Sequence, residues 1–84
     1  MTPIKLKLFS TLGAHLPPGA VRNCAEVEVA SEATPHDVIV QYHLPEESVH
    51  LVLINGVYVA PADRSTRRLQ AGDELAMWPP VAGG

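Results

Sequence analysis

The chain ends on two glycines, and the group most able to do chemistry is the carboxylate of the last one. Gly83 and Gly84 have no Cβ, so this pair can enter a channel too narrow for any other two residues. A terminal α-carboxyl group has a pKa of about 3.3–3.7 and is an anion at neutral pH. Since an anion is a poor electrophile, we expect a partner enzyme to activate it. Alternatively, the glycines are only a loose chain end.

The other residue types that could do chemistry do not form a convincing catalytic or metal-binding set. Cys24 has no base beside it in the sequence, which favours a buried strand cysteine over a nucleophile. Asp73 and Glu74 fit a turn residue and its solvated neighbour better than a catalytic acid pair. The four histidines lack a cysteine or carboxylate at ligand spacing, so we predict no metal site and no catalytic residue. They are His15, His36, His43 and His50.

The composition indicates one folded domain. The chain has 84 residues, of which 46% are hydrophobic, enough for a simple core behind one sheet. Its formal net charge is −3, and its six Lys and Arg residues are scattered apart from Arg64, Arg67 and Arg68. This charge pattern argues against a nucleic-acid partner and favours a protein partner. The three arginines can pair with acids on a partner, or they can form a solvated face.

Signals for export or membrane insertion are missing from the sequence. Apolar runs stay far below the length of a membrane span, and the chain opens without a basic leader followed by an apolar segment. A single cysteine cannot form an internal disulfide, which agrees with a reducing compartment. We therefore expect no membrane partner and a cytoplasmic location.

Two segments near the N-terminus alternate with the period of a strand. Residues 4–9 place Ile4, Leu6 and Leu8 on one side and lysines on the other. Residues 24–30 alternate in the same way. The stretch between them, 10–20, is rich in glycine and proline, so we predict a hairpin with a long irregular loop.

A short helix is predicted after this hairpin. Thr34 can cap it, Pro35 suits the first helical position, and Asp37 lies near the positive end of the helix dipole. Pro45 disfavours helical dihedrals in the residue before it, so the helix should end near residues 43–44.

The second half of the chain predicts three more strands. Residues 49–54 are almost wholly apolar, which is typical of a strand deep in a sheet. Asn55-Gly56 is a strong signal for a tight hairpin turn, so residues 57–59 should fold back on that strand. After a polar connection anchored by Leu69, residues 74–78 form the last strand, with Leu75 and Met77 facing the helix. One helix covers one face of such a sheet.

The uncovered face is the predicted partner interface. Phe9, Tyr58 and Trp78 all alternate with inferred core residues and should lie on it, although solitary surface aromatics are also common. Pro79-Pro80 ends strand pairing and belongs to the same interface. We therefore divide the chain into a domain over residues 1–78 and a flexible tail over residues 79–84.

The closing run 69–84 resembles the C-terminus of the MoaD/ThiS sulfur-carrier family, which includes the small subunit of molybdopterin synthase and the thiamine carrier. Residues 54–59 resemble the Val-Asn-Gly hairpin of that family. The order of predicted elements matches the ubiquitin-like β-grasp fold, an α+β fold with a mixed sheet of about five strands and one short helix on one face. The tail is more like the molybdopterin branch, and the short helix is more like the thiamine branch.

The resemblance implies that Gly84 is a substrate and that the chain itself is not an enzyme. An adenylating enzyme of the ubiquitin-activating type would use ATP and Mg²⁺, with no cofactor bound by this chain. A sulfur donor, a desulfurase or a rhodanese, would then convert the acyl adenylate to a thiocarboxylate. Val81, Ala82 and Gly83 would thread the partner's active site, and a synthase subunit would accept the sulfur.

Several functions remain open at this point. Sulfur transfer into molybdopterin is the first reading, followed by thiamine thiazole formation and other thiocarboxylate pathways. A ubiquitin-like modifier would instead join its diglycine to target lysines. In a plain binding module the tail would be incidental, and deletion of Gly84 would leave function intact.

Overall fold

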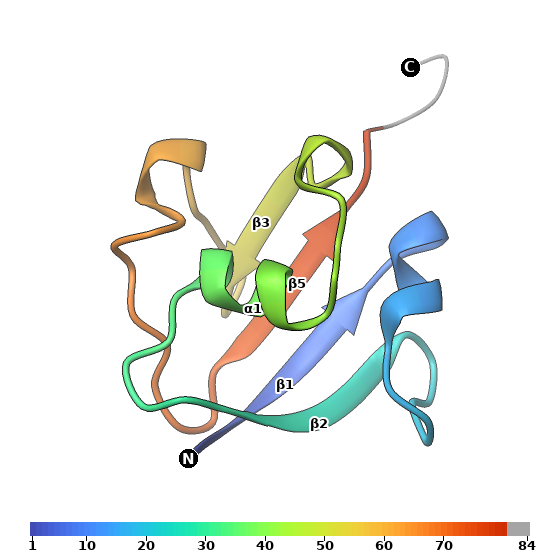
Figure 1. The fold of residues 1–84 in the computed structure, drawn as a ribbon, viewed down its shortest axis with the longest axis horizontal. Helices are drawn as coiled ribbons and strands as arrows, with labels where there is room; N and C mark the ends of the chain where they lie inside the picture. The colour runs from blue at the N-terminus through green and yellow to red at the C-terminus, as the bar shows by residue number, and fades with distance from the viewer. Residues whose placement is uncertain (81–84) are drawn as a thin grey trace.

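The first and last strands of the chain lie side by side and in parallel at the middle of a five-stranded sheet (Figure 1). The structure is a computed structural model and describes residues 1–80. In chain order the strands are β1 (Thr2–Leu8), β2 (Cys24–Val29), β3 (Leu51–Ile54), β4 (Val57–Tyr58) and β5 (Glu74–Trp78). Their order across the sheet is β2-β1-β5-β3-β4, and all neighbours other than β1 and β5 are antiparallel. The fold is the expected β-grasp.

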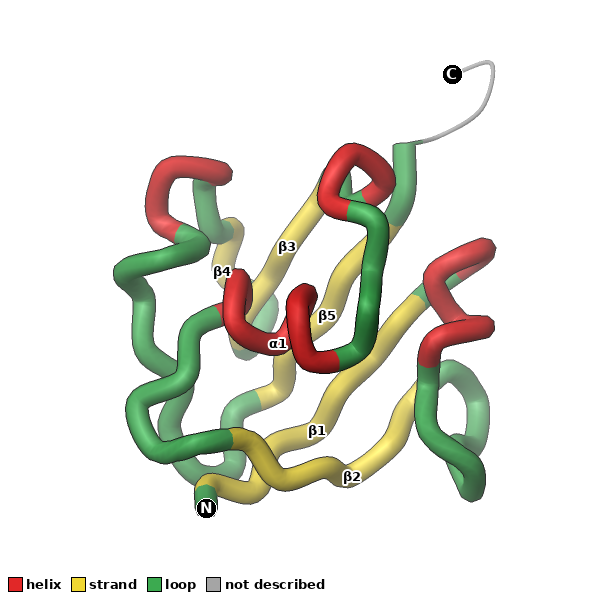
Figure 2. Tube along the Cα trace, in the orientation of Figure 1, coloured by secondary structure: helices red, strands yellow, loops and turns green. Residues whose placement is uncertain are grey.

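The helix α1 (Pro35–Gln41) crosses one face of this sheet (Figure 2). Thr34 Oγ1 accepts a hydrogen bond from the Asp37 backbone N–H at 3.3 Å, and Asp37 Oδ2 accepts one from the Thr34 N–H at 3.0 Å. This reciprocal capping satisfies two backbone donors that the first turn leaves free. The helix ends at Gln41, two to three residues earlier than predicted, and His43 has a left-handed φ of 56°.

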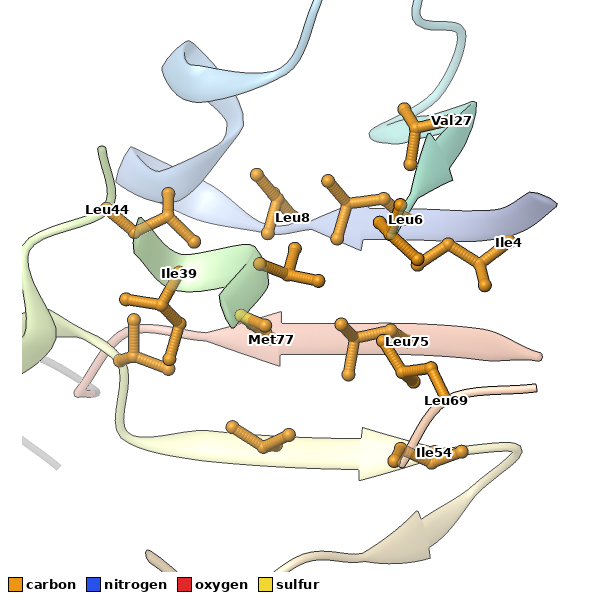
Figure 3. Close-up of a cluster of buried hydrophobic side chains, with 14 of the residues drawn as sticks. Ile4, Leu6, Leu8, Val27, Ile39, Leu44, Ile54, Leu69, Leu75 and Met77 are labelled. Atoms are coloured by element: carbon orange, nitrogen blue, oxygen red, sulfur yellow. The ribbon is translucent and has the colours of Figure 1, made fainter. Parts of the chain in front are cut away.

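The hydrophobic core lies between α1 and the sheet. Leu6, Leu8, Leu75 and Met77 have no exposed surface, because alternate residues of β1 and β5 point to the helix side (Figure 3). Ile39 meets them from the helix. The prediction that Leu75 and Met77 face the helix is confirmed.

The hairpin between β3 and β4 is also confirmed. Asn55 and Gly56 have φ values of 52° and 81°, and Ile54 pairs with Val57 across this two-residue turn. Positive φ at both central positions suits the twist of the flanking strands, and asparagine and glycine tolerate it best.

Three connections contain 3₁₀-helical turns where irregular loops were expected. They are η1 (Ser10–His15), η2 (Glu46–Ser48) and η3 (Pro61–Asp63). Leu12 of η1 is buried in the core, while Leu69 anchors the last connection as predicted, with its N–H bonded to the Ala33 carbonyl oxygen at 2.7 Å. Within residues 1–80, every helix falls short of the length and apolar character needed to cross a membrane.

Candidate functional site

The chain leaves the sheet at the end of β5, where Trp78 is the last strand residue. Pro79 is half-buried, Pro80 is exposed, and neither has an N–H to continue the pairing. The predicted tail begins here, and β1 and β5 both point to this end of the sheet (Figure 1). The residues with the proposed chemistry lie outside the described residues: Val81, Ala82, Gly83 and Gly84.

Strand register places the three predicted aromatic residues on the face that α1 leaves open. Trp78 alternates with the buried Met77, and its ring stacks on that of Phe9 with centroids 4.4 Å apart and planes 6° from parallel. Tyr58 pairs with Leu53, which pairs in turn with Ala76 of β5. Tyr58 keeps 57% of its surface exposed.

Two leucines extend this aromatic surface, and the sequence analysis missed them. Leu51 pairs with Trp78, and Leu53 lies beside Tyr58; both are half-buried. Their strand was expected to be buried on both faces because it is almost wholly apolar. It is internal to the sheet, but its open side has no second layer within residues 1–80. We call Phe9, Leu51, Leu53, Tyr58 and Trp78 the apolar half of the open face.

Charged residues fill the other half of the open face, which we call the charged half. Lys7 Nζ lies 3.1 Å from Glu74 Oε1. Lys5 pairs in register with Glu26 on one side and Glu74 on the other. The charged half therefore lies over β1, β2 and the start of β5. The apolar half lies over β3, β4 and the end of β5, next to the root of the tail.

Cys24 is not fully buried, contrary to the prediction. It pairs with Lys7 on the open face and is half-buried, because this edge of the sheet has no layer on that side. It lines a shallow groove of about 450 Å³ with Lys5, Lys7 and Gly19. The thiol therefore belongs to the surface rather than to the core.

The remaining candidate residues have local structural contacts. Asp73 is buried, and its carboxylate accepts hydrogen bonds from Asn55 Nδ2 at 2.9 Å and from the Gln70 N–H at 2.8 Å. His36 Nδ1 lies 2.9 Å from Glu46 Oε1. In the part of the chain that the structure describes, no three His, Cys, Asp or Glu side chains gather closely enough to hold a metal ion.

The arginines also have partners inside the chain. Arg64 donates from its two terminal nitrogens to the carbonyl oxygens of Val49 and His50, at 2.9 and 3.0 Å. Arg68 Nη1 lies 3.0 Å from Glu32 Oε1. Arg64 therefore connects two loops. This role differs from both predicted ones, a solvated arginine and a partner for an acid on another protein.

The sequence of this chain matches one protein family over most of its length. The model of a family described as the ThiS family matches residues 18–84, so the match includes β2 to β5 and the diglycine end. A search of curated proteins finds no match.

Solved structures show the same fold over nearly the full chain. SAMP1, small archaeal modifier protein 1, from Haloferax volcanii is 30% identical, with 98% of this chain and 99% of that chain covered and a TM-score of 0.66. The complex of subunits 1 and 2 of molybdopterin-converting factor from Helicobacter pylori gives 12% identity, coverages of 99% and 100%, and a TM-score of 0.60. Caldiarchaeum subterraneum ubiquitin is 18% identical, with 99% of this chain and 98% of that chain covered and a TM-score of 0.55. The last two likenesses show the fold alone.

Proposed function

Because the chain belongs to the ThiS family of small, ubiquitin-like carrier or modifier proteins, we propose that it is a sulfur carrier whose working group is the carboxylate of Gly84. The observation that carries this proposal is the family match through residue 84, which includes the diglycine end. The apolar half of the open face supports it, because a surface for a partner lies beside the root of the tail. In this reading the chain is a substrate of its partners and not an enzyme.

The chemistry begins with activation of the carboxylate by an adenylating partner. A carboxylate oxygen of Gly84 attacks the α-phosphorus of ATP, pyrophosphate leaves, and an acyl adenylate forms with the help of the partner's Mg²⁺. The terminal sulfur of a persulfide on a sulfur donor, a desulfurase or a rhodanese, then attacks the acyl carbon and AMP leaves. A thiol cleaves the resulting S–S bond, which releases the thiocarboxylate and a disulfide. Sulfur suits this step because a thiolate is a strong nucleophile at neutral pH.

The residues before Gly84 present it to these partners. Proline fixes φ near −65°, so Pro79 and Pro80 keep the root of the tail extended. We infer that Val81 anchors the tail at the partner, and that Ala82 and Gly83 thread its active site because their side chains are small or absent. The apolar half supplies Trp78 and Tyr58, residue types that dominate the binding energy of protein interfaces.

The sulfur acceptor that we favour is the large subunit of a molybdopterin synthase. The likeness to a chain of the Helicobacter pylori complex of subunits 1 and 2 supports this choice through the fold. The ThiS family match supports thiamine thiazole formation as the second candidate. Adenylation requires ATP, so we place the reaction in the cytoplasm.

A protein modifier is the alternative from another functional class, and the likeness to SAMP1 favours it. Both functions begin with adenylation, but a modifier ends as an isopeptide bond to a lysine of a target. The test is incubation with the adenylating enzyme, ATP, Mg²⁺ and the sulfur donor, using the natural chain and a variant without Gly84. We expect a thiocarboxylate on the natural chain only, with the same thermal unfolding for both. Normal loading of the shortened chain would refute the proposal, and larger conjugates cleavable at lysine would favour the modifier.

A further inference from the structure

Arg64 is held in a fork between two carbonyl groups far away in the sequence. Its terminal nitrogens donate to Val49 O at 2.9 Å and to His50 O at 3.0 Å, while its own carbonyl oxygen accepts from the His36 N–H at 2.9 Å. Its Nε atom is buried and has no hydrogen-bond partner within residues 1–80. A buried, unsatisfied donor costs free energy, and the two charge-assisted hydrogen bonds of the terminal nitrogens offset that cost and hold the side chain in place.

The loop that Arg64 holds also holds the root of the tail. The His50 N–H donates to the carbonyl oxygen of Trp78 at 2.9 Å, and Leu51 pairs with Trp78 in the ladder between β3 and β5. On the other side of β5, the Phe9 N–H donates to Met77 O at 3.2 Å, and the Phe9 ring stacks on Trp78. The end of β5 is therefore held on both sides, by Phe9 just after β1 and by His50 and Leu51 at the start of β3, and the second of these supports leads back to Arg64.

Beyond Trp78 the backbone cannot continue this support through its own donors. Pro79 and Pro80 have no N–H groups, so neither can donate to a neighbouring strand. The direction in which the tail leaves the sheet is consequently set at Trp78. Any freedom at His50 would pass directly to that residue through the bond between them.

We propose that Arg64 is a positioning residue for tail presentation: by holding the carbonyl groups of Val49 and His50, it fixes Trp78 and thus the direction of the tail. This inference rests on the proposed function, since direction matters only if a partner must receive Gly84. The chemistry is assigned to Gly84, and the role that we give Arg64 acts through Trp78. Its terminal nitrogens are engaged within the chain, which separates this role from pairing with an acid on a partner.

The expected effect of losing this contact is on binding rather than on the chemical step. Without the fork, the tail root samples several directions, and only a fraction of molecules present Gly84 productively. The apparent affinity falls by that fraction, whereas the bound complex reacts at the same rate. A charge-assisted hydrogen bond has a net effect on the order of tenfold in an equilibrium constant.

The test compares Arg64→Met with Arg64→Lys and with Arg67→Met as the matched control. Arg67 belongs to the same connection and is exposed, and within residues 1–80 its side chain donates only to the neighbouring carbonyl oxygen of Arg68. Trp78 is the single tryptophan, so fluorescence quenching by acrylamide reports directly on the tail root. ATP–pyrophosphate exchange with the adenylating enzyme gives KM and kcat separately.

For Arg64→Met we expect stronger quenching of Trp78 and a KM for the carrier raised about tenfold, with kcat within about twofold of the natural chain. Arg64→Lys should restore part of the KM, since an ammonium group can satisfy one carbonyl but not the planar fork. Arg67→Met should match the natural chain in both measurements.

Two results would overturn the proposal. One is a folded Arg64→Met variant with unchanged Trp78 quenching and unchanged KM. The other is a fall in kcat with KM unchanged, because it would place Arg64 in the chemical step. If Arg64→Met does not fold, Arg64→Lys decides by the same criteria. Failure of the natural chain to be adenylated would count against the proposed function, and Trp78 quenching alone would then decide whether Arg64 holds the tail root.

Discussion

The two faces of the sheet use the same strands for different purposes. On the covered face, Leu6, Leu75 and Met77 have no exposed surface. On the open face, Trp78 is half-buried and Tyr58 is 57% exposed. Because side chains alternate along a strand, Met77 and Trp78 are neighbours in the chain but belong to different faces. Stability and partner binding are therefore separated by a single residue step, and substitutions on the covered face should act mainly on stability, those on the open face mainly on binding.

The largest effect on stability is expected from the covered face. Leu75→Ala removes a wholly buried side chain beneath α1 and should lower the free energy of unfolding by about 2–5 kcal/mol, measured by denaturant titration. The folded fraction should bind the adenylating enzyme as the natural chain does, since Leu75 is out of a partner's reach. Leu75→Met, which keeps the volume, is the control and should cost less than about 1.5 kcal/mol. A clear loss of affinity in fully folded Leu75→Ala would break the separation of the two faces.

The largest effect on binding is expected from the open face. Trp78→Ala should weaken binding to the adenylating enzyme by about 2–4 kcal/mol in calorimetric titration, since buried tryptophans dominate interface energies. It should destabilise the chain less than Leu75→Ala, because Trp78 is already partly in water. Trp78→Phe keeps an aromatic ring to stack on Phe9 and should recover part of the affinity. Unchanged affinity in Trp78→Ala would remove the apolar half from the interface.

The charged half of the open face should matter little by comparison. Lys7→Met breaks the ion pair with Glu74 but keeps the apolar stem of the side chain. Both groups are more than 30% exposed, so the change in unfolding free energy should be about 0–1 kcal/mol and should shrink further in high salt. A change in unfolding free energy above this range at high salt would contradict the view that the pair is a solvent-screened surface contact.

The smallest expected effect concerns Tyr42, which packs against the covered side. Burial raises the pKa of Tyr42 above 10.0, partly opposed by its hydrogen bond with Gln41. The unfolded chain then loses the phenolic proton at lower pH than the folded chain. The contribution of Tyr42 to the free energy of unfolding is therefore fully present below pH 10 and is lost as the pH rises through the pKa of the folded state. Tyr42→Phe should show a shallower decline in alkaline denaturation curves. An identical decline in both proteins would contradict this.

Local patterns in the sequence predict most of the sheet. Alternation in residues 4–9 and 24–30 depends only on period two, and Asn55-Gly56 carries its turn geometry in its own backbone preferences. The helix start is equally local, since Thr34 and Asp37 cap each other across one turn. These features need no knowledge of distant residues.

The features that were missed depend on distant contacts. Arg64 bonds to carbonyl groups 14 and 15 residues earlier, and no pattern within the connection indicates that. Leu51 and Leu53 read as buried because an apolar run does not reveal whether a second layer covers it. A 3₁₀ turn such as η1 is too short to show an amphipathic period.

The most direct test of the account is to locate the sulfur. The chain is incubated with its adenylating enzyme, ATP, Mg²⁺ and the sulfur donor. The whole protein, without prior digestion, is then fragmented in a mass spectrometer. We predict that one oxygen of the Gly84 carboxylate is replaced by sulfur and that Cys24, the half-buried thiol of the open face, is unmodified. Sulfur found on Cys24 as a persulfide, with an unaltered carboxylate at Gly84, would contradict the account.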